Sequence, residues 1–92
     1  MRILVTPTFE RTVKKLHKQQ KAVLDEAVQI ISKQPDQGET KVGDLAGVKV
    51  YKFRMGNLLC LLAYRRLDEN TLKLLMVGPH ENFYRDLKST KE

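Results

Sequence analysis

One stretch of the sequence determines the fold: residues 48–79, VKVYKFRMGNLLCLLAYRRLDENTLKLLMVGP. Short turn segments at Met55–Asn57 and Leu67–Asn70 divide it into runs with strand character. These runs are Val48–Arg54, Leu58–Arg66 and Thr71–Val77. Consecutive strands with such short connections pair as antiparallel neighbours. The stretch therefore predicts a three-stranded antiparallel meander.

The N-terminus predicts one more strand and the start of a helix. Arg2–Thr6 is a short alternating run with Ile3 and Val5 on one face, as is typical of a strand. Thr6 is a residue type that caps helices, and Pro7 suits the first helical position, where its missing amide hydrogen costs nothing. A helix is therefore expected to begin at Pro7.

Two sets of apolar residues at helical spacing follow. They are Phe9, Val13 and Leu16, then Leu24, Ala27, Val28 and Ile31. The second set covers a wider face, which fits a more deeply packed helix. We place the break between two helices near Lys18–Gln20, although no glycine or proline marks it. Turn residues at Pro35–Gly38 end this helical hairpin, and the polar stretch from there to Gly47 is predicted to be a loop.

These elements predict an α+β fold with two layers, a helical hairpin packed on an antiparallel sheet. The order is β-α-α-β-β-β, with the first strand at a sheet edge and a short C-terminal segment at His80–Lys88. The 92 residues are enough for one small domain and too few for two. We therefore predict a single domain over residues 1–92 and exclude large modular enzymes.

Charge and cysteine content indicate the class of binding partner and the cellular compartment. With 17 Lys and Arg against 11 Asp and Glu, the formal net charge is +6, which suits a polyanionic partner, either nucleic acid or an acidic protein. The one cysteine, Cys60, lies in an apolar run and is expected to be a buried core residue in a reducing compartment. Apolar stretches are too short for a signal peptide or a membrane span, so we expect a cytoplasmic location.

The residues best suited to chemistry on the sheet are Lys52 and Arg54. Strand alternation places both on one face, and it places Tyr51 and Phe53 on the other, which should meet the helices. Two neighbouring cations on an open sheet face could bind phosphate, and arginine can do so with two hydrogen bonds. The plainer alternative is an ordinary solvated strand face.

His80 and Tyr84 are the candidate groups for proton transfer. His80 follows Gly78-Pro79 at a strand end, and a histidine there can act as general acid or base near neutral pH. Tyr84, one helical turn further on, could share the site as a second proton donor or as a ring that stacks on a base. For His80 the alternative is an ordinary hydrogen-bonded loop residue.

The sequence predicts neither a metal site nor a bound cofactor. His17 and His80 lie far apart and lack ligand partners at familiar spacing. Phosphate-binding loops, dinucleotide fingerprints and nucleophile elbows are also missing from the sequence. A basic stripe on the first helix is either a solvated face or a nucleic-acid contact. It consists of Arg11, Lys14, Lys15, Lys18 and Lys21.

Six short strings, in order and at compatible spacing, span nearly the whole chain. They are Phe9-Glu10-Arg11, Leu45-Ala46-Gly47, Tyr51-Lys52-Phe53-Arg54, Gly56-Asn57, Tyr64 and Gly78-Pro79-His80-Glu81-Asn82-Phe83-Tyr84-Arg85-Asp86-Leu87. Together they resemble the RelE/ParE superfamily of bacterial toxins from type II toxin-antitoxin systems. The resemblance is closer to the RelE and YafQ branch than to ParE.

This resemblance implies a toxin with one of two activities. RelE-type members enter the ribosomal A site and cleave mRNA without a metal, using the RNA 2′-hydroxyl as nucleophile on the adjacent phosphate. ParE-type members inhibit DNA gyrase. We expect a RelE-like mRNA interferase that a cognate antitoxin neutralises. The alternatives are a ParE-like gyrase inhibitor without nuclease activity and a degenerate member that only binds.

The resemblance also implies roles for individual residues. Lys52 and Arg54 match basic strand residues that would neutralise charge on the phosphate. His80 matches a histidine of the YafQ-like branch and would act as general acid or base, and Tyr84 lies near a tyrosine important in RelE, at a different spacing from the glycine. Further cations would contact the message or ribosomal RNA. These are Lys14, Lys15, Lys18, Lys49, Arg65 and Arg66.

One departure from the family pattern concerns the third strand, where the relatives often have an arginine. Alignment from Gly56 places Leu59 at that position, and alignment from Tyr64 places Leu61 there. Both leucines lie on the same strand face, so the site is less cationic than the RelE pattern. Apolar residues on an open face could instead contact a protein, which favours the gyrase alternative.

Overall fold

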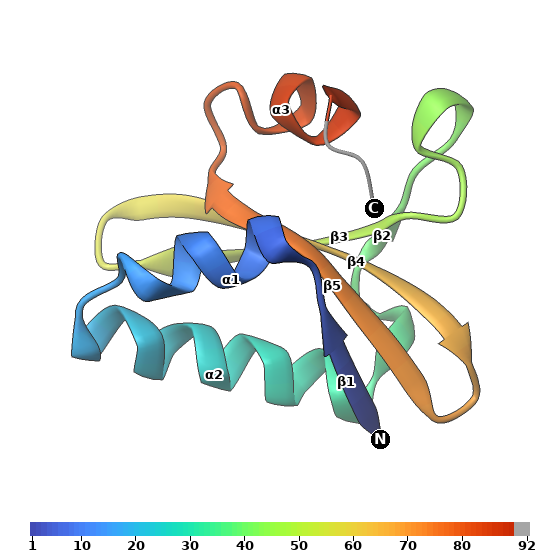
Figure 1. The fold of residues 1–92 in the computed structure, drawn as a ribbon, viewed down its shortest axis with the longest axis horizontal. Helices are drawn as coiled ribbons and strands as arrows, with labels where there is room; N and C mark the ends of the chain where they lie inside the picture. Colours follow the sequence, from blue (N-terminus) through green and yellow to red (C-terminus); the bar gives the residue numbers. More distant parts are fainter. Residues whose placement is uncertain (90–92) are drawn as a thin grey trace.

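Five strands form one sheet in the order β1-β5-β4-β3-β2 in the computed structural model, which describes residues 1–89 (Figure 1). Their bounds are Arg2–Val5 for β1, Glu39–Thr40 for β2, Lys49–Met55 for β3, Leu58–Asp68 for β4 and Thr71–Pro79 for β5. Neighbours among β3, β4 and β5 are antiparallel, which confirms the predicted meander. The two-residue strand β2 lies within the stretch that was expected to be loop, and it pairs with β3.

The α+β fold class is confirmed, with one correction to the sheet. β1 joins an edge as expected, but it pairs with β5 in parallel, so the sheet is mixed and not entirely antiparallel. The cause is the path of the chain. The two helices after β1 carry it across one face, and the meander then returns with β5 running in the same direction as β1 (Figure 1).

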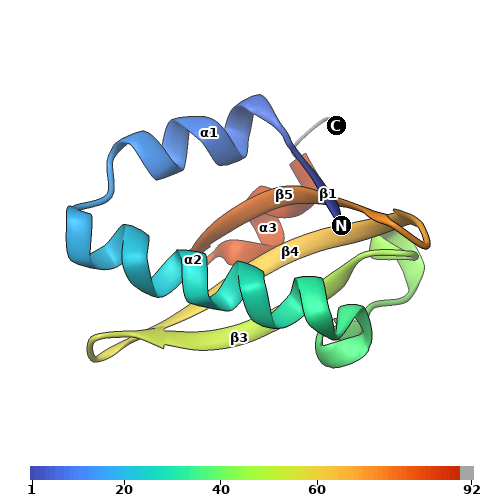
Figure 2. The same ribbon diagram turned by 90° about the horizontal axis from the view of Figure 1, so that it is seen from below.

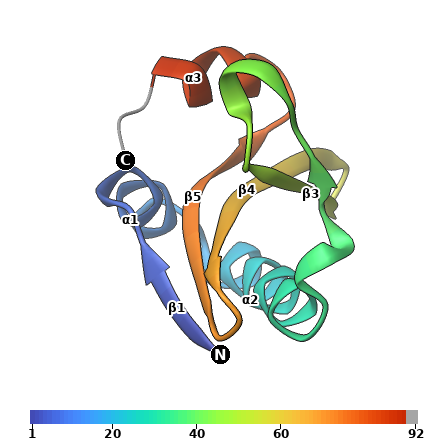
Figure 3. The same cartoon turned by 90° about the vertical axis from the view of Figure 1, so that its right-hand side faces the viewer.

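Helices cover both faces of the sheet. Their bounds are Pro7–Lys14 for α1, Lys18–Lys33 for α2 and Phe83–Ser89 for α3, with short helical turns at Pro35–Gln37 and Gly43–Leu45. Figure 2 shows α1 and α2 over one face with α3 behind the sheet, and Figure 3 shows the sheet edge-on between them. We call the two sides the hairpin face and the α3 face. The side that was expected to be open is therefore partly covered by α3.

The break between α1 and α2 lies at Lys15–His17, three residues before the predicted position at Lys18–Gln20. His17 is the N-cap of α2, and its backbone N–H donates a hydrogen bond to Oε1 of Gln20 at 2.8 Å. A side chain that returns to the cap in this way can start a new helix without glycine or proline. The apolar pattern alone does not reveal such a cap.

Thr6 fixes the corner between β1 and α1, as predicted. Its Oγ1 accepts a hydrogen bond from the backbone N–H of Phe9 at 3.1 Å and donates one to the carbonyl of Leu75 at 2.6 Å. Pro7 is the first residue of α1. One buried hydroxyl thus caps the helix and ties it to β5.

Strand alternation divides the buried residues between two clusters. The cluster on the hairpin face consists of Phe9, Leu24, Ala27, Ile31, Leu62, Tyr64, Leu72, Leu74 and Val77. The cluster on the α3 face consists of Val48, Val50, Leu61, Ala63, Leu75, Met76, Phe83 and Leu87. Tyr51 and Phe53 pack against the first cluster, which confirms their predicted direction. Cys60 is buried as expected, and this burial raises the pKa of its thiol.

The turn between β4 and β5 predicts a small pH dependence of stability. The backbone N–H of Asn70 donates a hydrogen bond to Oδ1 of Asp68 at 2.8 Å, and this bond, with one from the Thr71 side chain, holds the pKa of Asp68 below its usual value. A carboxylate with a lowered folded pKa contributes its full stabilisation above the unfolded pKa. The contribution is lost as pH falls through the folded pKa.

Asp68→Asn should therefore lower the Tm slightly at neutral pH, and the difference from the wild type should disappear in acid. Thermal melts followed by circular dichroism across this pH range measure the effect. A constant difference at every pH would contradict the titration of Asp68 as its cause.

Candidate functional site

The register of the sheet brings Arg54 and His80 to the same end of it. Arg54 pairs with Leu59 on β4. From the other side, the backbone N–H of His80 donates to the carbonyl of Leu59 at 3.0 Å, so His80 continues the row beyond the end of β5. Neighbouring strands lie about 4.8 Å apart, so the backbones of Arg54 and His80 lie roughly 10 Å from each other across Leu59.

Lys52 lies two residues before Arg54 on β3, on the same face of the sheet. It pairs with Leu61, and Leu61 pairs with Gly78. Lys52 and Arg54 are both exposed on β3, beyond the part of the α3 face that is covered. The side chain of Arg54 turns toward the hairpin between β3 and β4, where its Nη1 lies 3.5 Å from the carbonyl oxygen of Asn57.

The two leucines that replace the expected arginine differ in exposure. Leu61 is fully buried in the cluster under α3, so it belongs to the core and not to an open surface. Leu59 is half-buried and lies between Arg54 and His80 in the same row. The expectation of two exposed leucines on this face is therefore wrong for Leu61, because α3 covers that part of β4. Leu59 places an apolar side chain between Arg54 and His80.

The ring of Tyr84 lies next to His80, as their spacing predicts. The two ring centroids are 6.4 Å apart and the planes are perpendicular. Phe83, 1% exposed, anchors α3 in the core, and its ring makes a second perpendicular contact with Tyr84 at 5.7 Å. Asn82 allows this arrangement because its φ of 62° turns the chain sharply before α3 begins. His80 itself is exposed, and Tyr84 is half-buried.

Lys41 is a member of this site that the sequence did not identify. It follows β2, and its Nζ lies 4.9 Å from the centroid of the Tyr84 ring. Nζ also forms an ion pair with Oε2 of Glu39 at 3.2 Å. Desolvation acts to lower the pKa of Lys41, but the interactions with Tyr84 and Glu39 outweigh it, and the net pKa is raised. A lysine in a polar stretch gives no signal that could have found it.

The remaining predicted cations lie outside the row of Arg54, Leu59 and His80. Lys14, Lys15 and Lys18 are exposed around the turn between α1 and α2. Arg65 and Arg66 lie towards the far end of β4 and pair with the beginning of β5. Arg65 lies six positions after Leu59 along β4, which is roughly 20 Å. The two arginines therefore lie far from His80 along the sheet.

Lys49 and Arg65 are engaged within the protein. Nζ of Lys49 donates to Oγ1 of Thr40 at 2.7 Å and lies 3.6 Å from Oδ1 of Asp36. The guanidinium of Arg65 donates to the carbonyl of Ala46 at 3.2 Å. Lys49 thus holds the chain at Asp36 and Thr40, and Arg65 holds it at Ala46.

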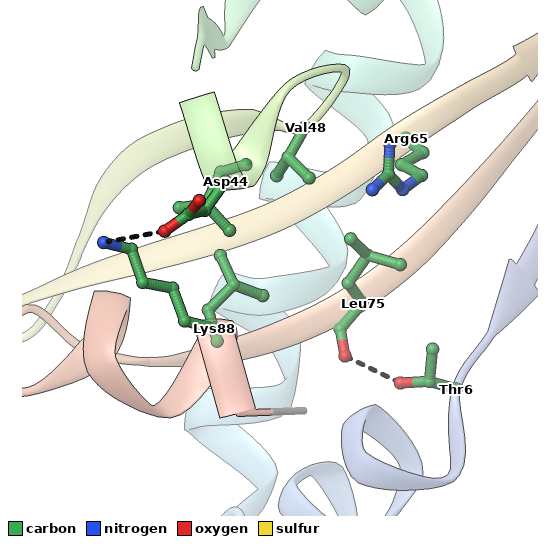
Figure 4. Close-up of a pocket in the computed structure, with 8 residues that line it drawn as sticks. Thr6, Asp44, Val48, Arg65, Leu75 and Lys88 are labelled. Carbon is green, nitrogen blue, oxygen red and sulfur yellow. Dashed lines mark hydrogen bonds and ion pairs between the residues drawn. The ribbon is translucent and has the colours of Figure 1, made fainter. Parts of the chain in front are cut away.

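A cleft of about 260 Å³ lies between α3, the segment around Gly43–Leu45 and the sheet (Figure 4). Leu75 and Val48 form part of its floor, and its rim includes an ion pair of 4.0 Å between Lys88 and Asp44. This cleft is on the α3 face but does not include Lys52, Arg54 or His80 among its lining residues.

The part of the chain that the structure describes contains no group of three or more metal-ligating side chains. His17 caps α2 and His80 follows β5, so the two histidines belong to separate elements. None of the helices within residues 1–89 is long and apolar enough to cross a bilayer.

Comparison with known proteins identifies the family. Residues 3–88 match the family described as ParE-like toxin of type II bacterial toxin-antitoxin system. No curated protein sequence matches the chain significantly.

Three solved structures share the fold. A free mutant of the E. coli toxin RelE is 16% identical, with a TM-score of 0.73 over 96% of this chain and 92% of that one. In the intact E. coli RelBE toxin-antitoxin complex, the matching chain is 17% identical, with a TM-score of 0.69 over 87% of this chain and 96% of that one. In the RelBE2 toxin-antitoxin complex from Mycobacterium tuberculosis, the matching chain is 29% identical, with a TM-score of 0.65 over 86% and 96%. These structures show the shared fold, and the match over residues 3–88 shows that the chain belongs to the ParE-like toxins of type II bacterial toxin-antitoxin systems.

Proposed function

We propose that this toxin is an mRNA interferase that cleaves the message on the ribosome. The observation that carries the proposal is the arrangement at the end of the sheet. Two exposed cations, Lys52 and Arg54, lie on one side of Leu59, and the exposed His80 lies on the other. Tyr84 supplies a second protic group beside the histidine. Such a site can bind a phosphate through its cations and accept a proton from the hydroxyl of the neighbouring ribose.

The reaction needs only positioning, charge neutralisation and proton transfer. The RNA 2′-oxygen forms a bond to the adjacent phosphorus while the bond from phosphorus to the 5′-oxygen breaks. The products are a 2′,3′-cyclic phosphate and a 5′-hydroxyl. One group accepts the proton of the 2′-hydroxyl and another returns a proton to the leaving 5′-oxygen. His80 supplies one of these functions and Tyr84 is the candidate for the other, while Lys52 and Arg54 stabilise the charge on the phosphate oxygens.

Purified toxin incubated with ribosomes that carry a defined mRNA tests this proposal. Primer extension should show new 5′ ends within the translated region, and these ends should accept phosphate from a polynucleotide kinase because they carry a 5′-hydroxyl. The same mRNA without ribosomes is the control and should stay largely intact. Growth arrest in cells whose mRNA remains uncut would overturn the nuclease proposal.

Inhibition of DNA gyrase is the second candidate function. Leu59 favours it, because it places an apolar side chain where the nuclease branch often has an arginine, and the matching family is described as ParE-like. The burial of Leu61 removes the other exposed apolar residue from the argument. A supercoiling assay distinguishes the two activities, since a gyrase inhibitor should block supercoiling and leave mRNA intact.

The proposed partner in the cell is a cognate antitoxin, in the cytoplasm. Two of the similar structures are toxin-antitoxin complexes. The net charge of +6 favours an acidic antitoxin segment that covers Lys52 and Arg54. The outer cations of the α1–α2 turn would contribute salt-dependent contacts to ribosomal RNA. Neutralisation of growth arrest by the product of a neighbouring acidic reading frame would test the pairing.

A further inference from the structure

Lys41 connects the edge of the sheet to the ring of Tyr84. Its ammonium group lies over the face of that ring at 4.9 Å from the centroid, well within the distance of about 6 Å at which a cation and an aromatic ring attract each other. The Lys41 side chain is 22% exposed, so the contact is partly shielded from water and stronger than it would be on an open surface. Glu39, paired with the same ammonium group at 3.2 Å, holds it in place.

The backbone that leads into Lys41 is held by hydrogen bonds. Before it, the N–H of Gly38 donates to the Tyr64 hydroxyl at 3.0 Å, and β2 then pairs with β3 through Glu39 opposite Val50. The N–H of Lys41 itself donates to the carbonyl of Val48 at 2.9 Å. Lys41 therefore extends from a rigid part of the sheet.

Tyr84, in contrast, lies on a short helix. α3 has seven residues, and a helix of this length depends on tertiary contacts for its stability. Phe83 and Leu87 anchor one side of α3 in the core. Lys41 contacts the ring of Tyr84 from the β2 side, while His80 contacts it from the strand end. The ring is thus in contact with a residue more than forty positions earlier in the chain.

We propose that Lys41 is a positioning residue of the toxin, which holds the Tyr84 ring in the orientation that faces His80. The catalytic consequence rests on the proposed ribonuclease function. Lysine is protonated at neutral pH at its ordinary pKa, and the surroundings of Lys41 raise that pKa further, so Lys41 does not itself exchange protons during the reaction. Its effect is on the geometry of Tyr84, and misplacement of a reacting group slows turnover more than it weakens binding.

Lys41→Met is the informative variant, because it keeps an unbranched apolar side chain and removes the charge. Single-turnover cleavage on programmed ribosomes should slow by about tenfold, with the affinity for the ribosome changed by less than about twofold. Lys41→Arg should restore most of the rate, since guanidinium also stacks on aromatic rings. A matched control is Lys88→Met, which removes a charge from α3 itself, where Lys88 pairs with Asp44 and not with Tyr84.

A double-mutant cycle tests whether Lys41 acts through Tyr84. In a Tyr84→Leu background, Lys41→Met should cause no further loss of rate, because the group it positions is gone. Equal losses from Lys41→Met and Lys88→Met, or a full additional loss in the Tyr84→Leu background, would overturn the proposal and leave the ribonuclease function intact.

Fluorine NMR with 3-fluorotyrosine tests the contact between Lys41 and Tyr84 independently of the ribonuclease function. The chain has three tyrosines, Tyr51, Tyr64 and Tyr84. Lys41→Met should shift the Tyr84 resonance and leave those of Tyr51 and Tyr64 in place, whatever the enzymatic activity of the protein. An unchanged Tyr84 resonance would overturn the contact itself. The Tyr84 resonance could also shift in Lys41→Met while the wild-type protein fails to cleave mRNA. That result would support the contact but overturn both the ribonuclease function and the catalytic consequence of Lys41.

Discussion

His80→Ala is expected to reduce ribosome-dependent cleavage of mRNA by about 100-fold or more, because a positioned acid or base contributes at least that factor to proton transfer. The fold should survive the change. His80 is exposed, and its backbone N–H, which bonds to Leu59, remains in the variant. Surface substitutions of this kind change the free energy of unfolding by about 0.5 kcal/mol or less. The loss should therefore appear in the single-turnover rate, with Tm almost unchanged.

The other histidine provides the matched control. His17 is exposed at the N-cap of α2, and the bond from its backbone N–H to Oε1 of Gln20 can form in the variant, so His17→Ala should leave cleavage unchanged. A His80→Gln variant keeps hydrogen bonding but cannot transfer a proton, and it should be as slow as His80→Ala. Full activity of both His80 variants would remove His80 from the mechanism.

The arrangement of the sheet part of the site could be predicted because strands have few degrees of freedom. Alternation alone determines that Tyr51 and Phe53 face the helices, which places Lys52 and Arg54 on the opposite side. A two-residue turn between β3 and β4 then fixes which residues pair, and Gly56 accommodates it with a φ of 66°. The position of Leu59 next to Arg54 follows from this register.

Features that depend on single contacts could not be predicted. β2 has two residues in a polar stretch, and it exists because Glu39 and Thr40 pair with β3, which no local pattern shows. Leu75 is an extra residue on β5, opposite the step between Ala63 and Tyr64, and it interrupts the alternation of that strand.

The same limit explains why Lys41 was missed and why one side of the sheet was expected to be open. Lys41 belongs to the site only through its contact with Tyr84, which lies on another element. The covering of Leu61 depends on how α3 folds back over the sheet, and that path begins at the turn of Asn82. Neither contact has a signature in the spacing of residues along the chain.

The second large effect concerns Gly38, where a single added methyl group should destabilise the protein. A Cβ atom at this position would lie 2.6 Å from the Tyr64 hydroxyl oxygen and 2.9 Å from its Cε1 atom, both closer than non-bonded contact allows. Tyr64 is fully buried and donates a hydrogen bond from this hydroxyl to the carbonyl of Pro35 at 2.7 Å, so it has no free space into which to move. Gly38→Ala should lower the free energy of unfolding by about 3 kcal/mol, the upper range for overpacking a core. That is a large fraction of the roughly 5–15 kcal/mol that stabilises a domain.

Removing the hydroxyl should separate the clash from other effects of the substitution. Tyr64→Phe alone leaves the Gly38 N–H and the Pro35 carbonyl without this partner, which should cost about 1–3 kcal/mol. In that background the nearest atom to the new Cβ is absent, so Gly38→Ala should cost clearly less than it does in the wild type. Urea unfolding of the four proteins measures this coupling directly.

Gly78→Ala is the matched control, because the nearest atom to its added Cβ, Cδ1 of Phe83, is at an ordinary distance of 3.9 Å. Its cost should stay within about 1 kcal/mol, the range of ordinary glycine replacements. The φ of Gly38 is −75°, which alanine adopts freely. Backbone strain is therefore not the cause of the destabilisation expected for Gly38→Ala. Equal costs for Gly38→Ala in the tyrosine and phenylalanine backgrounds would therefore mean that the Tyr64 hydroxyl is not what excludes a side chain at position 38.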